Sequence, residues 1–327
     1  MAFNRDNYKK VKRAFEEKER AAKDTADAKK RALGAQHPDI AAVDRELSQT
    51  SMLIMREISQ GPDRIAERID ELRRSNLALQ KVREELLISH GYPANYTDPA
   101  YECEICHDAG YLADGSMCSC FKRAMVLAGY ESSGIGRLLQ TQSFESFKVE
   151  YYSDDARSFE NMKRVFALCR AYADSFTAGA GNLLLCGKTG LGKTHISTSI
   201  AKVVIERGYD VVYDTAQNIF RDFEREKFER SYSSQESAAP STDRYFACDL
   251  LIIDDLGTEM SNTFTVSCLY NMINSRMIAG KSMIINTNLN QDELMKRYSD
   301  RITSRLFGEF SPLLFSGVDV RQKKLGF

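Results

Sequence analysis

Tryptophan, proline and long apolar runs are scarce or absent in this 327-residue sequence. It contains no tryptophan and six prolines, while charged residues make up 28% of it, and this combination favours helix-rich structure. The longest apolar runs, such as NLLLC and DLLII, are too short to span a bilayer. The N-terminus, MAFNRDNYKK, lacks the apolar stretch and the cleavage site of a secretory signal. These absences predict a soluble cytoplasmic protein that does not contact a membrane.

An excess of charge of either sign is also lacking, because 45 Lys and Arg residues nearly balance 46 Asp and Glu residues, for a net charge of -1. No global field therefore draws the chain to nucleic acid, and any contact with DNA must come from a local patch. Hydrophobic residues make up 43% of the sequence, as in ordinary globular proteins. The length allows two or three domains.

Cysteine is concentrated in one stretch, CEICHDAGYLADGSMCSC at 103–120, which holds four of the eight cysteines. Clustered thiols in an intracellular protein indicate a metal site or catalysis before disulfides. A C-x2-C pair and a C-x-C pair, separated by turn-forming residues, can supply four thiolates to one structural, tetrahedral zinc ion. Four reduced cysteines on a flexible loop are the alternative, and His107 could replace one cysteine as a ligand. The expected zinc ligands are Cys103, Cys106, Cys118 and Cys120.

The first ninety residues have the pattern of three helices. Pro38 and Pro62 stand where a first helical turn accepts proline, and apolar residues recur at near-helical spacing in the second and third segments. Such helices form either an antiparallel hairpin with a solvated charged face or a docking module for a partner protein, and the pattern does not separate the two. The helices are expected at about 4–33, 38–59 and 62–89.

The second half of the chain alternates apolar strands with helical patterns. This alternation predicts a parallel sheet that is covered by helices on both faces. The stretch SYSSQESAAPST at 231–242 lacks hydrophobic residues and is expected to form a mobile surface loop. After a helix at 154–176, the expected strands are 182–186, 210–214, 249–254 and 282–287, and the expected helices are 193–207, 215–230, 263–279 and 291–305.

The segment GKTGLGKT at 187–194 lies between an expected strand and an expected helix, which is the context of the phosphate-binding P-loop. Its glycines allow a tight loop whose amides point at phosphate oxygens. Lys193 would place a charge between the β- and γ-phosphates of ATP, and the Thr194 hydroxyl would bind Mg²⁺. A chance glycine-rich turn is the alternative. The residues expected to bind the nucleotide here are Gly187, Thr189, Gly190, Gly192, Lys193 and Thr194.

Two further strands end in polar residues that would lie at the same edge of the sheet. CDLLIIDDLG at 248–257 is a buried strand that ends in two carboxylates. Asp254 is expected to hold Mg²⁺ through water, and Asp255 to orient the attacking water, although a solvated Asp-Asp turn is the alternative. In MIINTN at 283–288, the Asn288 amide could hydrogen-bond the γ-phosphate or that water.

The segment RYSDRITSRLFG at 297–308 places Arg301 and Arg305 one turn apart on one helical face. They are either ordinary surface arginines or candidates for an arginine finger, which reaches the γ-phosphate of a neighbouring subunit.

In this order and spacing, the P-loop, the IIDDLG strand, the NTN strand end and the D-R-I-x-S-R-L box resemble the AAA+ ATPases. Within them, the segment from about 140 to 327 is most similar to the DnaC/DnaI bacterial helicase loaders and the related IstB transposition ATPases. The pattern Y-x-C-x2-C-x-D-x-G-Y and the later C-x-C resemble the zinc-bearing N-terminal domain of DnaI-type loaders, which IstB-type proteins generally lack.

The resemblance implies three domains and a role for each. Residues 1–90 would be a helical coiled-coil or hairpin region that docks a partner, and 91–135 a zinc-binding module. Residues 136–327 would be an AAA+ ATPase domain that lacks a full helical lid. The implied function is an ATP-dependent loader that binds a DnaB-type replicative helicase and single-stranded DNA, and that self-associates in the ATP state.

The resemblance also implies roles for single residues. Lys193 and Thr194 become the Walker A pair, Asp254 the Walker B residue and Asn288 the residue called sensor 1. Arg305 becomes the arginine finger with Arg301 as its rival, and Arg321 the sensor 2 arginine. Asp255 stands where many AAA+ proteins have a glutamate, so the carboxylate is one methylene shorter and hydrolysis is expected to be slow.

The helix expected at 215–230 corresponds in the resemblance to an insertion that lines a single-stranded DNA path. Phe220 and Phe223 would offer stacking surface, and Arg221, Arg225 and Arg230 would contact phosphates. The alternative is that the two phenylalanines, at i and i+3, belong to the core.

Two other functions compete with the loader. One is a transposition or phage-type helper ATPase with the same motor and a different client. The other is a small-molecule kinase with an appended zinc module, against which the arginine pair and the lack of an evident second substrate lobe both argue.

Overall fold

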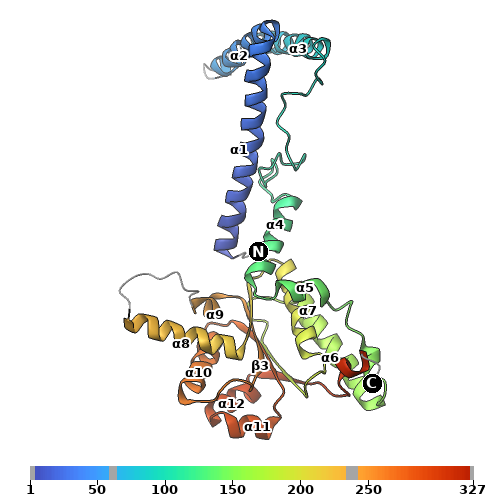
Figure 1. Ribbon diagram of the computed structural model, residues 1–327, viewed down its shortest axis with the longest axis vertical. Helices are drawn as coiled ribbons and strands as arrows, with labels where there is room; N and C mark the ends of the chain where they lie inside the picture. The colour runs from blue at the N-terminus through green and yellow to red at the C-terminus, as the bar shows by residue number, and fades with distance from the viewer. Residues whose placement is uncertain (1–3, 59–64, 233–241, 325–327) are drawn as a thin grey trace. The chain divides into compact units, whose positions relative to one another are not determined.

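The computed structural model describes residues 4–58, 65–232 and 242–324 (Figure 1). The chain forms two compact units, which we describe separately. The sheet unit comprises Met1–Val11 and Phe121–Phe327, and the helical unit comprises Lys12–Cys120. Two sequence-based expectations, the helix start at Pro62 and most of the loop at 231–242, lie outside the described residues.

A five-stranded parallel sheet forms the centre of the sheet unit, with the strand order β2-β3-β4-β1-β5. Its central strands are built from nearly continuous apolar runs, as expected when both faces of a parallel sheet are buried. The predicted α/β class with a parallel sheet is thus confirmed. The strands are β1 (Asn182–Cys186), β2 (Val211–Thr215), β3 (Leu250–Leu256), β4 (Ser282–Thr287) and β5 (Phe310–Leu314).

Helices cover both faces of this sheet. Successive leucines of β1 point to opposite faces, since Leu183 and Leu185 belong to one buried cluster and Leu184 to the other. In Figure 1, α6 and α7 lie on one side of β3, and α8 and α10 on the other. The first face is covered by α5 (Gly136–Thr141), α6 (Ala156–Asp174) and α7 (Lys193–Glu206), and the second by α8 (Ala216–Tyr232), α9 (Asp243–Ala247), α10 (Thr263–Ile278), α11 (Gln291–Arg297) and α12 (Asp300–Gly308).

The prediction of a single helix at 291–305 is wrong, because the structure has two helices there. Tyr298 has extended backbone angles between α11 and α12. Its buried hydroxyl donates a hydrogen bond to the carboxylate of Glu259, which is also buried. Apolar periodicity in the sequence does not reveal this long-range contact, which holds Tyr298 out of a helical conformation.

A buried arginine ties together the amino-terminal ends of two strands. Arg276, in α10, is fully buried, and its Nη1 donates to the carbonyl oxygens of Tyr245 at 2.8 Å and Cys248 at 3.1 Å. Its Nη2 donates to the carbonyl oxygen of Ser282 at 2.7 Å. Cys248 precedes β3 and Ser282 begins β4, so one guanidinium satisfies carbonyls from separate segments at this end of the sheet.

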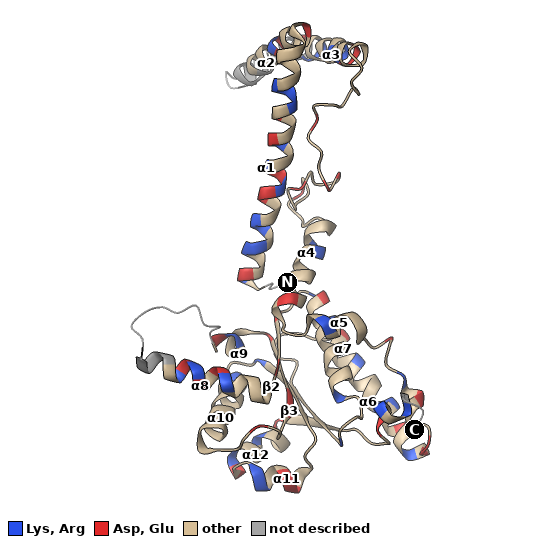
Figure 2. Cartoon of the chain, viewed as in Figure 1, with Lys and Arg blue, Asp and Glu red and all other residues tan. Residues whose placement is uncertain are grey.

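The helical unit contains the three helices predicted from the sequence. Its described core is small: Leu33, Ile40 and Leu87 are buried, with a few partly buried neighbours. Lys and Arg alternate with Asp and Glu along α1 (Figure 2), and exposed pairs of this kind contribute little stability. The helices are α1 (Arg5–Gln36), which begins in the sheet unit, α2 (Pro38–Ile58) and α3 (Ile65–Ser89). Within the described ranges, no helix has the length and apolar character that a bilayer crossing requires.

Candidate nucleotide site and cysteine cluster

The P-loop connects β1 to the first turn of α7, as the sequence predicted. Gly187 has a φ of 151°, and a Cβ there would lie 2.5 Å from the Phe315 carbonyl oxygen. Gly192 has a φ of 82°, and a Cβ would lie 2.9 Å from the Phe147 ring. Both positions therefore require glycine for their backbone conformation and for space. The loop packs closely against its surroundings and presents the N-terminus of a helix, which favours bound anions.

Lys193 lies at the centre of the loop. Its side chain is buried, and its ammonium donates hydrogen bonds to the carbonyl oxygens of Gly187 at 2.6 Å and Lys188 at 2.9 Å. Burial lowers the pKa of this ammonium, while the nearby carboxylates of Asp255 and Asp254 act in the opposite direction. The P-loop thus contains a buried ammonium group, that of Lys193, which can bind a phosphate.

Asp254 is held by hydrogen bonds to both of its carboxylate oxygens. Its Oδ2 accepts from the Thr194 hydroxyl at 3.0 Å and from the Tyr213 hydroxyl at 2.5 Å. Its Oδ1 accepts from Asn286 Nδ2 at 2.7 Å, and that amide also donates to the Ser197 hydroxyl at 2.8 Å. The two residues predicted to bind magnesium, Thr194 and Asp254, therefore lie side by side, and oxygen donors of this kind suit Mg²⁺.

Tyr213 and Asn286 were not identified from the sequence. Burial and the Asp254 carboxylate raise the pKa of Tyr213 well above its ordinary value, so the phenol remains a neutral hydrogen-bond donor. Both residues are polar positions inside otherwise apolar strands, β2 and β4. A buried polar residue in a strand requires a hydrogen-bond partner. The sequence therefore indicated that these two residues have partners, but it did not identify Asp254 as the partner.

Asp255 and Arg321 lie around the same cleft as the P-loop. The cleft has a volume of about 270 Å³ and is also lined by Gln142, His195 and the loop from Thr189 to Thr194. Asp255 lies within the bulge of β3, between Ile253 and Leu256, and has a left-handed φ of 52°, an uncommon backbone conformation that often occurs at functional sites. Desolvation, and then the Asp254 carboxylate, raise the pKa of Asp255.

Asn288 lies in a neighbouring cleft instead. That cleft, of about 500 Å³, borders the other side of the P-loop at Gly187 and Lys188. Asn288 is exposed there, while the preceding Thr287 donates its hydroxyl to the Leu256 carbonyl oxygen at 2.7 Å. The role of Asn288 as a sensor of nucleotide stays a prediction, and Asn286 makes the direct contact with Asp254.

Neither candidate finger arginine lines the nucleotide cleft. Arg305 Nη2 donates to Asn274 Oδ1 at 2.7 Å, and its guanidinium lies 4.7 Å from the centre of the Tyr270 ring. Arg301, one turn earlier on α12, is exposed. An arginine finger acts on the nucleotide site of a neighbouring subunit, so either residue is expected to lie outside its own cleft. The choice between Arg301 and Arg305 therefore stays a prediction.

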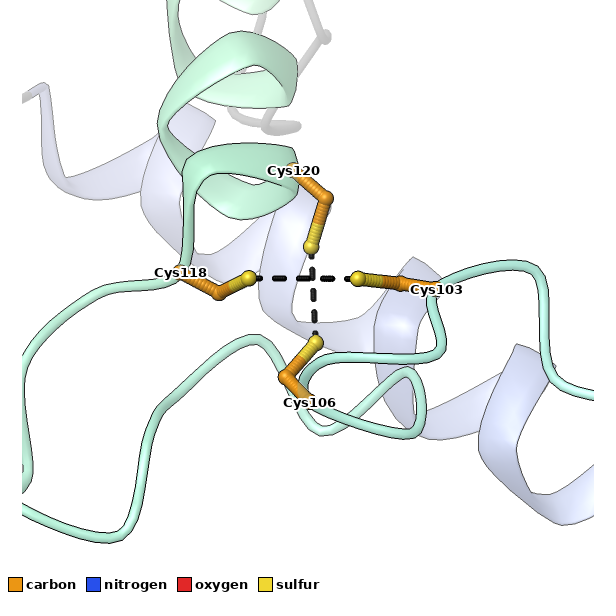
Figure 3. Close-up of side chains that lie close together, drawn as sticks. All are labelled: Cys103, Cys106, Cys118 and Cys120. Atoms are coloured by element: carbon orange, nitrogen blue, oxygen red, sulfur yellow. Dashed lines mark hydrogen bonds between the residues drawn. The ribbon is translucent and has the colours of Figure 1, made fainter.

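The four predicted zinc ligands converge in the helical unit (Figure 3). All four sulfur atoms lie within 4.8 Å of one another. The Sγ atoms of Cys103 and Cys118 are 3.9 Å apart, and those of Cys106 and Cys120 are 3.4 Å apart. Thiolates bound to one tetrahedral zinc at about 2.3 Å lie about 3.8 Å from each other, so the cluster fits this ion.

Backbone contacts shape the loops that carry these cysteines. The Asp108 carboxylate accepts hydrogen bonds from the backbone amides of Glu102 and Cys103, both at 2.9 Å. The amide of Gly110 donates to Cys106 Sγ at 3.4 Å. His107 is exposed, its ring lies 5.0 Å from that of Tyr101, and it is not part of the group of four.

The P-loop, the aspartate pair at the end of β3 and the parallel sheet together define an AAA+ P-loop ATPase. The family model described as "IstB-like ATP binding protein" matches residues 136–306, which is just over half of the chain. The chain belongs to this family, and it is an ATPase.

Several known proteins are similar to this chain. The replicative helicase loader DnaC of Escherichia coli (strain K12) is 25% identical over 177 residues, which are 54% of this chain and 67% of DnaC. A crystal structure of the DnaC helicase loader superposes with a TM-score of 0.45 at 18% identity, covering 55% of this chain and 99% of the other. A crystal structure of DnaI gives a TM-score of 0.43 at 20% identity, covering 56% and 92%.

Proposed function

We propose that this protein is an ATP-dependent loader of a replicative helicase in DNA replication. The observation that carries the proposal is the pairing of Thr194 and Asp254 beside the P-loop, in a chain whose sequence is similar to a replicative helicase loader. The ATPase would act as a switch on a client rather than as a kinase, because the described residues form no evident second substrate lobe beside the nucleotide cleft.

The residues of the cleft would divide the work of hydrolysis. Bound Mg²⁺ would neutralise charge on the β- and γ-phosphates, and Thr194 and Asp254 would hold it. Lys193 would stabilise the negative charge that develops on the phosphates. Asp255 would orient the attacking water and accept its proton, a role for which its raised pKa is suited. Because its side chain is shorter than that of glutamate, we expect slow turnover that serves regulation. Arg321, at the same cleft, would contact the γ-phosphate.

The site would be completed between subunits. Arg305, or its rival Arg301, would reach the γ-phosphate of a neighbouring copy. Self-association would then depend on ATP, either among copies of this chain or on the client. The exposure of Arg301 and the distance of both side chains from their own cleft support this arrangement.

We further propose that the cysteine cluster holds one structural zinc ion. Four thiolates leave no open position for chemistry. The ion would order the segment from Cys103 to Cys120, while residues 1–90 would dock the helicase. The sulfur separations of 3.4 and 3.9 Å support this role.

The DNA contact would lie on α8, with a changed set of residues. The expected stacking role of Phe220 and Phe223 is wrong, because Phe220 is buried and Phe223 packs against the rings of Tyr245 and Phe246. Phe228 is 62% exposed and offers the apolar surface instead. Arg221, Arg225 and Lys227 are exposed on the same helix, but acidic residues are interspersed along it (Figure 2), so we expect modest affinity. The side chain of Arg230 is not among those that the structure describes, so its predicted phosphate contact stays a prediction.

Titration of single-stranded DNA would test this surface. Arg221→Ala/Arg225→Ala should weaken binding in the presence of ATP and reduce its salt dependence, with a decrease in slope of about 1.4 for two lost phosphate contacts. Phe228→Ala should weaken binding with little change in slope. The control is Lys202→Ala on α7, on the other face of the sheet. Salt-insensitive binding, or equal binding by all four proteins, would reject the surface.

Co-elution of the full-length protein with a DnaB-type replicative helicase would test the loader function. With ATP, we expect a stable complex and helicase-dependent loading onto single-stranded DNA circles. Lys193→Ala should fail to load, whereas the exposed neighbour Lys188→Ala should load normally. Retained ATPase activity without any association with the helicase would reject the loader while leaving the ATPase intact.

A transposition helper ATPase is the second candidate, because the matching family model is that of IstB-like proteins. The two functions share the nucleotide site and differ in the client. Stimulation of turnover by a transposase–DNA complex, but not by the replicative helicase, would favour the helper.

A further inference from the structure

Two of the four histidines of this protein converge at one point of the helical unit, and neither belongs to the cysteine cluster. His37 lies between α1 and α2, and His90 directly follows α3. Their ring centroids are 4.0 Å apart, with an angle of 38° between the planes. Asp39, in the first turn of α2, completes the group, since its Oδ2 lies 2.8 Å from His90 Nε2.

The geometry points to a second metal site, at which His37, Asp39 and His90 bind one first-row divalent transition-metal ion such as Zn²⁺. The ligand atoms of the three side chains lie within 4.8 Å of one another. Two ligands of one tetrahedral zinc at about 2.0–2.1 Å lie about 3.3 Å apart, so small side-chain rotations bring all three to one ion. Two imidazoles and one carboxylate suit zinc, nickel or cobalt better than calcium or magnesium.

A hydrogen bond between His90 and Asp39, together with the edge-to-face packing of His37 on Tyr92 at 5.6 Å, is the simpler explanation of this group. It does not require the ligand atoms of all three side chains to lie close to one another, as they do here, whereas a shared metal ion does. The three side chains are half-buried or exposed, so an ion can enter and water can complete its coordination.

The surroundings of the site suggest what the ion would do. Leu33, Ile40 and Leu87 form the small buried core beside it, each within four residues of a ligand. Only these three residues form the buried cluster that the described part of the chain shows here, and small domains often gain folding free energy from a bound metal. The ion would tie the turn between α1 and α2 to the end of α3, and so hold the helical unit together independently of the cysteines.

Metal counting on the full-length protein tests this inference. After equilibration with buffered Zn²⁺ and removal of free metal, His37→Phe and His90→Ala should each contain one zinc ion per chain fewer than the wild type. His37→Phe retains a ring against Tyr92, which lies 5.6 Å from His37, so its packing is preserved. Asp39→Asn should hold the ion more weakly. The matched controls are His107→Ala and His195→Ala, which alter the other two histidines and should retain the wild-type content.

The test compares the zinc content of each variant with that of the wild type. Its result therefore does not depend on whether the cysteines hold zinc or on whether the protein loads a helicase. Zn²⁺ should also raise the thermal midpoint of the Cys118→Ser/Cys120→Ser variant, and this increase should vanish when His37→Phe is added. An equal zinc content in the wild type and in His37→Phe and His90→Ala would overturn the site. An equal loss in His195→Ala, which lies in the sheet unit, would show non-specific binding and would overturn it too.

Discussion

The sheet unit and the helical unit are stabilised in different ways. In the sheet unit, two large buried clusters cover the faces of β1 to β5, and every described strand contributes to them. In the helical unit, the described core consists of Leu33, Ile40 and Leu87, while most charged residues of α1 are exposed. Apolar burial is the main source of folding free energy, so a bound metal ion would add to the helical unit a stabilisation that the sheet unit obtains from its two buried clusters.

Lys193→Ala should produce the largest effect, and it should be confined to the sheet unit. Removing the charge at the centre of the P-loop should reduce ATP binding and turnover to background, because no other side chain of the loop replaces it. Nucleotide titration and phosphate release measure the two quantities. Lys188→Ala is the control and should behave as the wild type. Unchanged affinity together with unchanged turnover would refute the assignment, and a change in zinc content would contradict the independence of the units.

Arg305→Ala should reduce turnover while ATP affinity stays nearly unchanged, since its own P-loop is intact. An arginine finger contributes roughly 10³–10⁵ in rate in other NTPases, and we expect the lower end here because turnover is slow. Steady-state kinetics with the client present measures it. Asn274→Ala is the control, because it removes the hydrogen-bond partner of Arg305 but keeps the guanidinium.

Mixing Arg305→Ala subunits with Lys193→Ala subunits sharpens this test. A mixed interface pairs an intact P-loop with an intact finger, so partial activity should return. If Arg301→Ala shows the loss and the rescue while Arg305→Ala is silent, the finger is Arg301. If both variants are silent and the protein stays monomeric with ATP and client, the mechanism in trans fails.

Cys118→Ser/Cys120→Ser should loosen the helical unit and leave the sheet unit intact. We expect the loss of the cysteine-bound zinc ion and faster proteolysis within Lys12–Cys120, with basal ATP turnover within about twofold of the wild type, because both cysteines belong to the helical unit and the P-loop belongs to the sheet unit. Metal analysis, limited proteolysis and phosphate release measure these three outcomes. Cys268→Ser, on α10, is the control. Full zinc retention in the double variant would count against the site.

Tyr213→Phe should have the smallest effect, and it should fall on Mg²⁺ rather than on ATP. The variant loses one hydrogen bond to a carboxylate, worth about 1.5–3 kcal/mol in other proteins. We therefore expect the Mg²⁺ concentration for half-maximal turnover to rise by about tenfold, the equivalent of about 1.4 kcal/mol. Tyr245→Phe, a buried tyrosine that bonds Asp214 and Asp222 instead, is the control for stability. Equal Mg²⁺ dependence in both variants would reject the positioning role.

The sequence predicted the parts of the molecule that depend on local pattern. The four strands with continuous apolar runs were expected within one or two residues of their positions, and the P-loop was expected in full, because its spacing and its flanking elements are contiguous. The two aspartates near the end of β3 were placed at the correct edge, because parallel strands all end there.

The remaining features depend on contacts between distant segments. Tyr298 separates α11 from α12 because it bonds Glu259, 39 residues earlier, and periodicity does not record such a bond. Phe220 and Phe223 repeat at helical spacing, which fits a core face and a stacking face equally well. Tyr213 and Asn286 meet Asp254 only once the sheet has formed, and the convergence of His37 with His90 has no local signature.

The buried guanidinium of Arg276 has a mechanical consequence. It joins the chain before β3 to the start of β4, at the end of the strands opposite the nucleotide cleft. Separating these segments would leave the buried guanidinium and its carbonyl acceptors without hydrogen-bond partners, so this end of the sheet resists deformation. At the carboxyl ends of the strands, the crosslinks run instead through the carboxylate of Asp254, which bonds Tyr213 of β2 and Asn286 of β4. Binding of nucleotide and Mg²⁺ would therefore act directly on the bonds at this end and leave those of Arg276 unchanged.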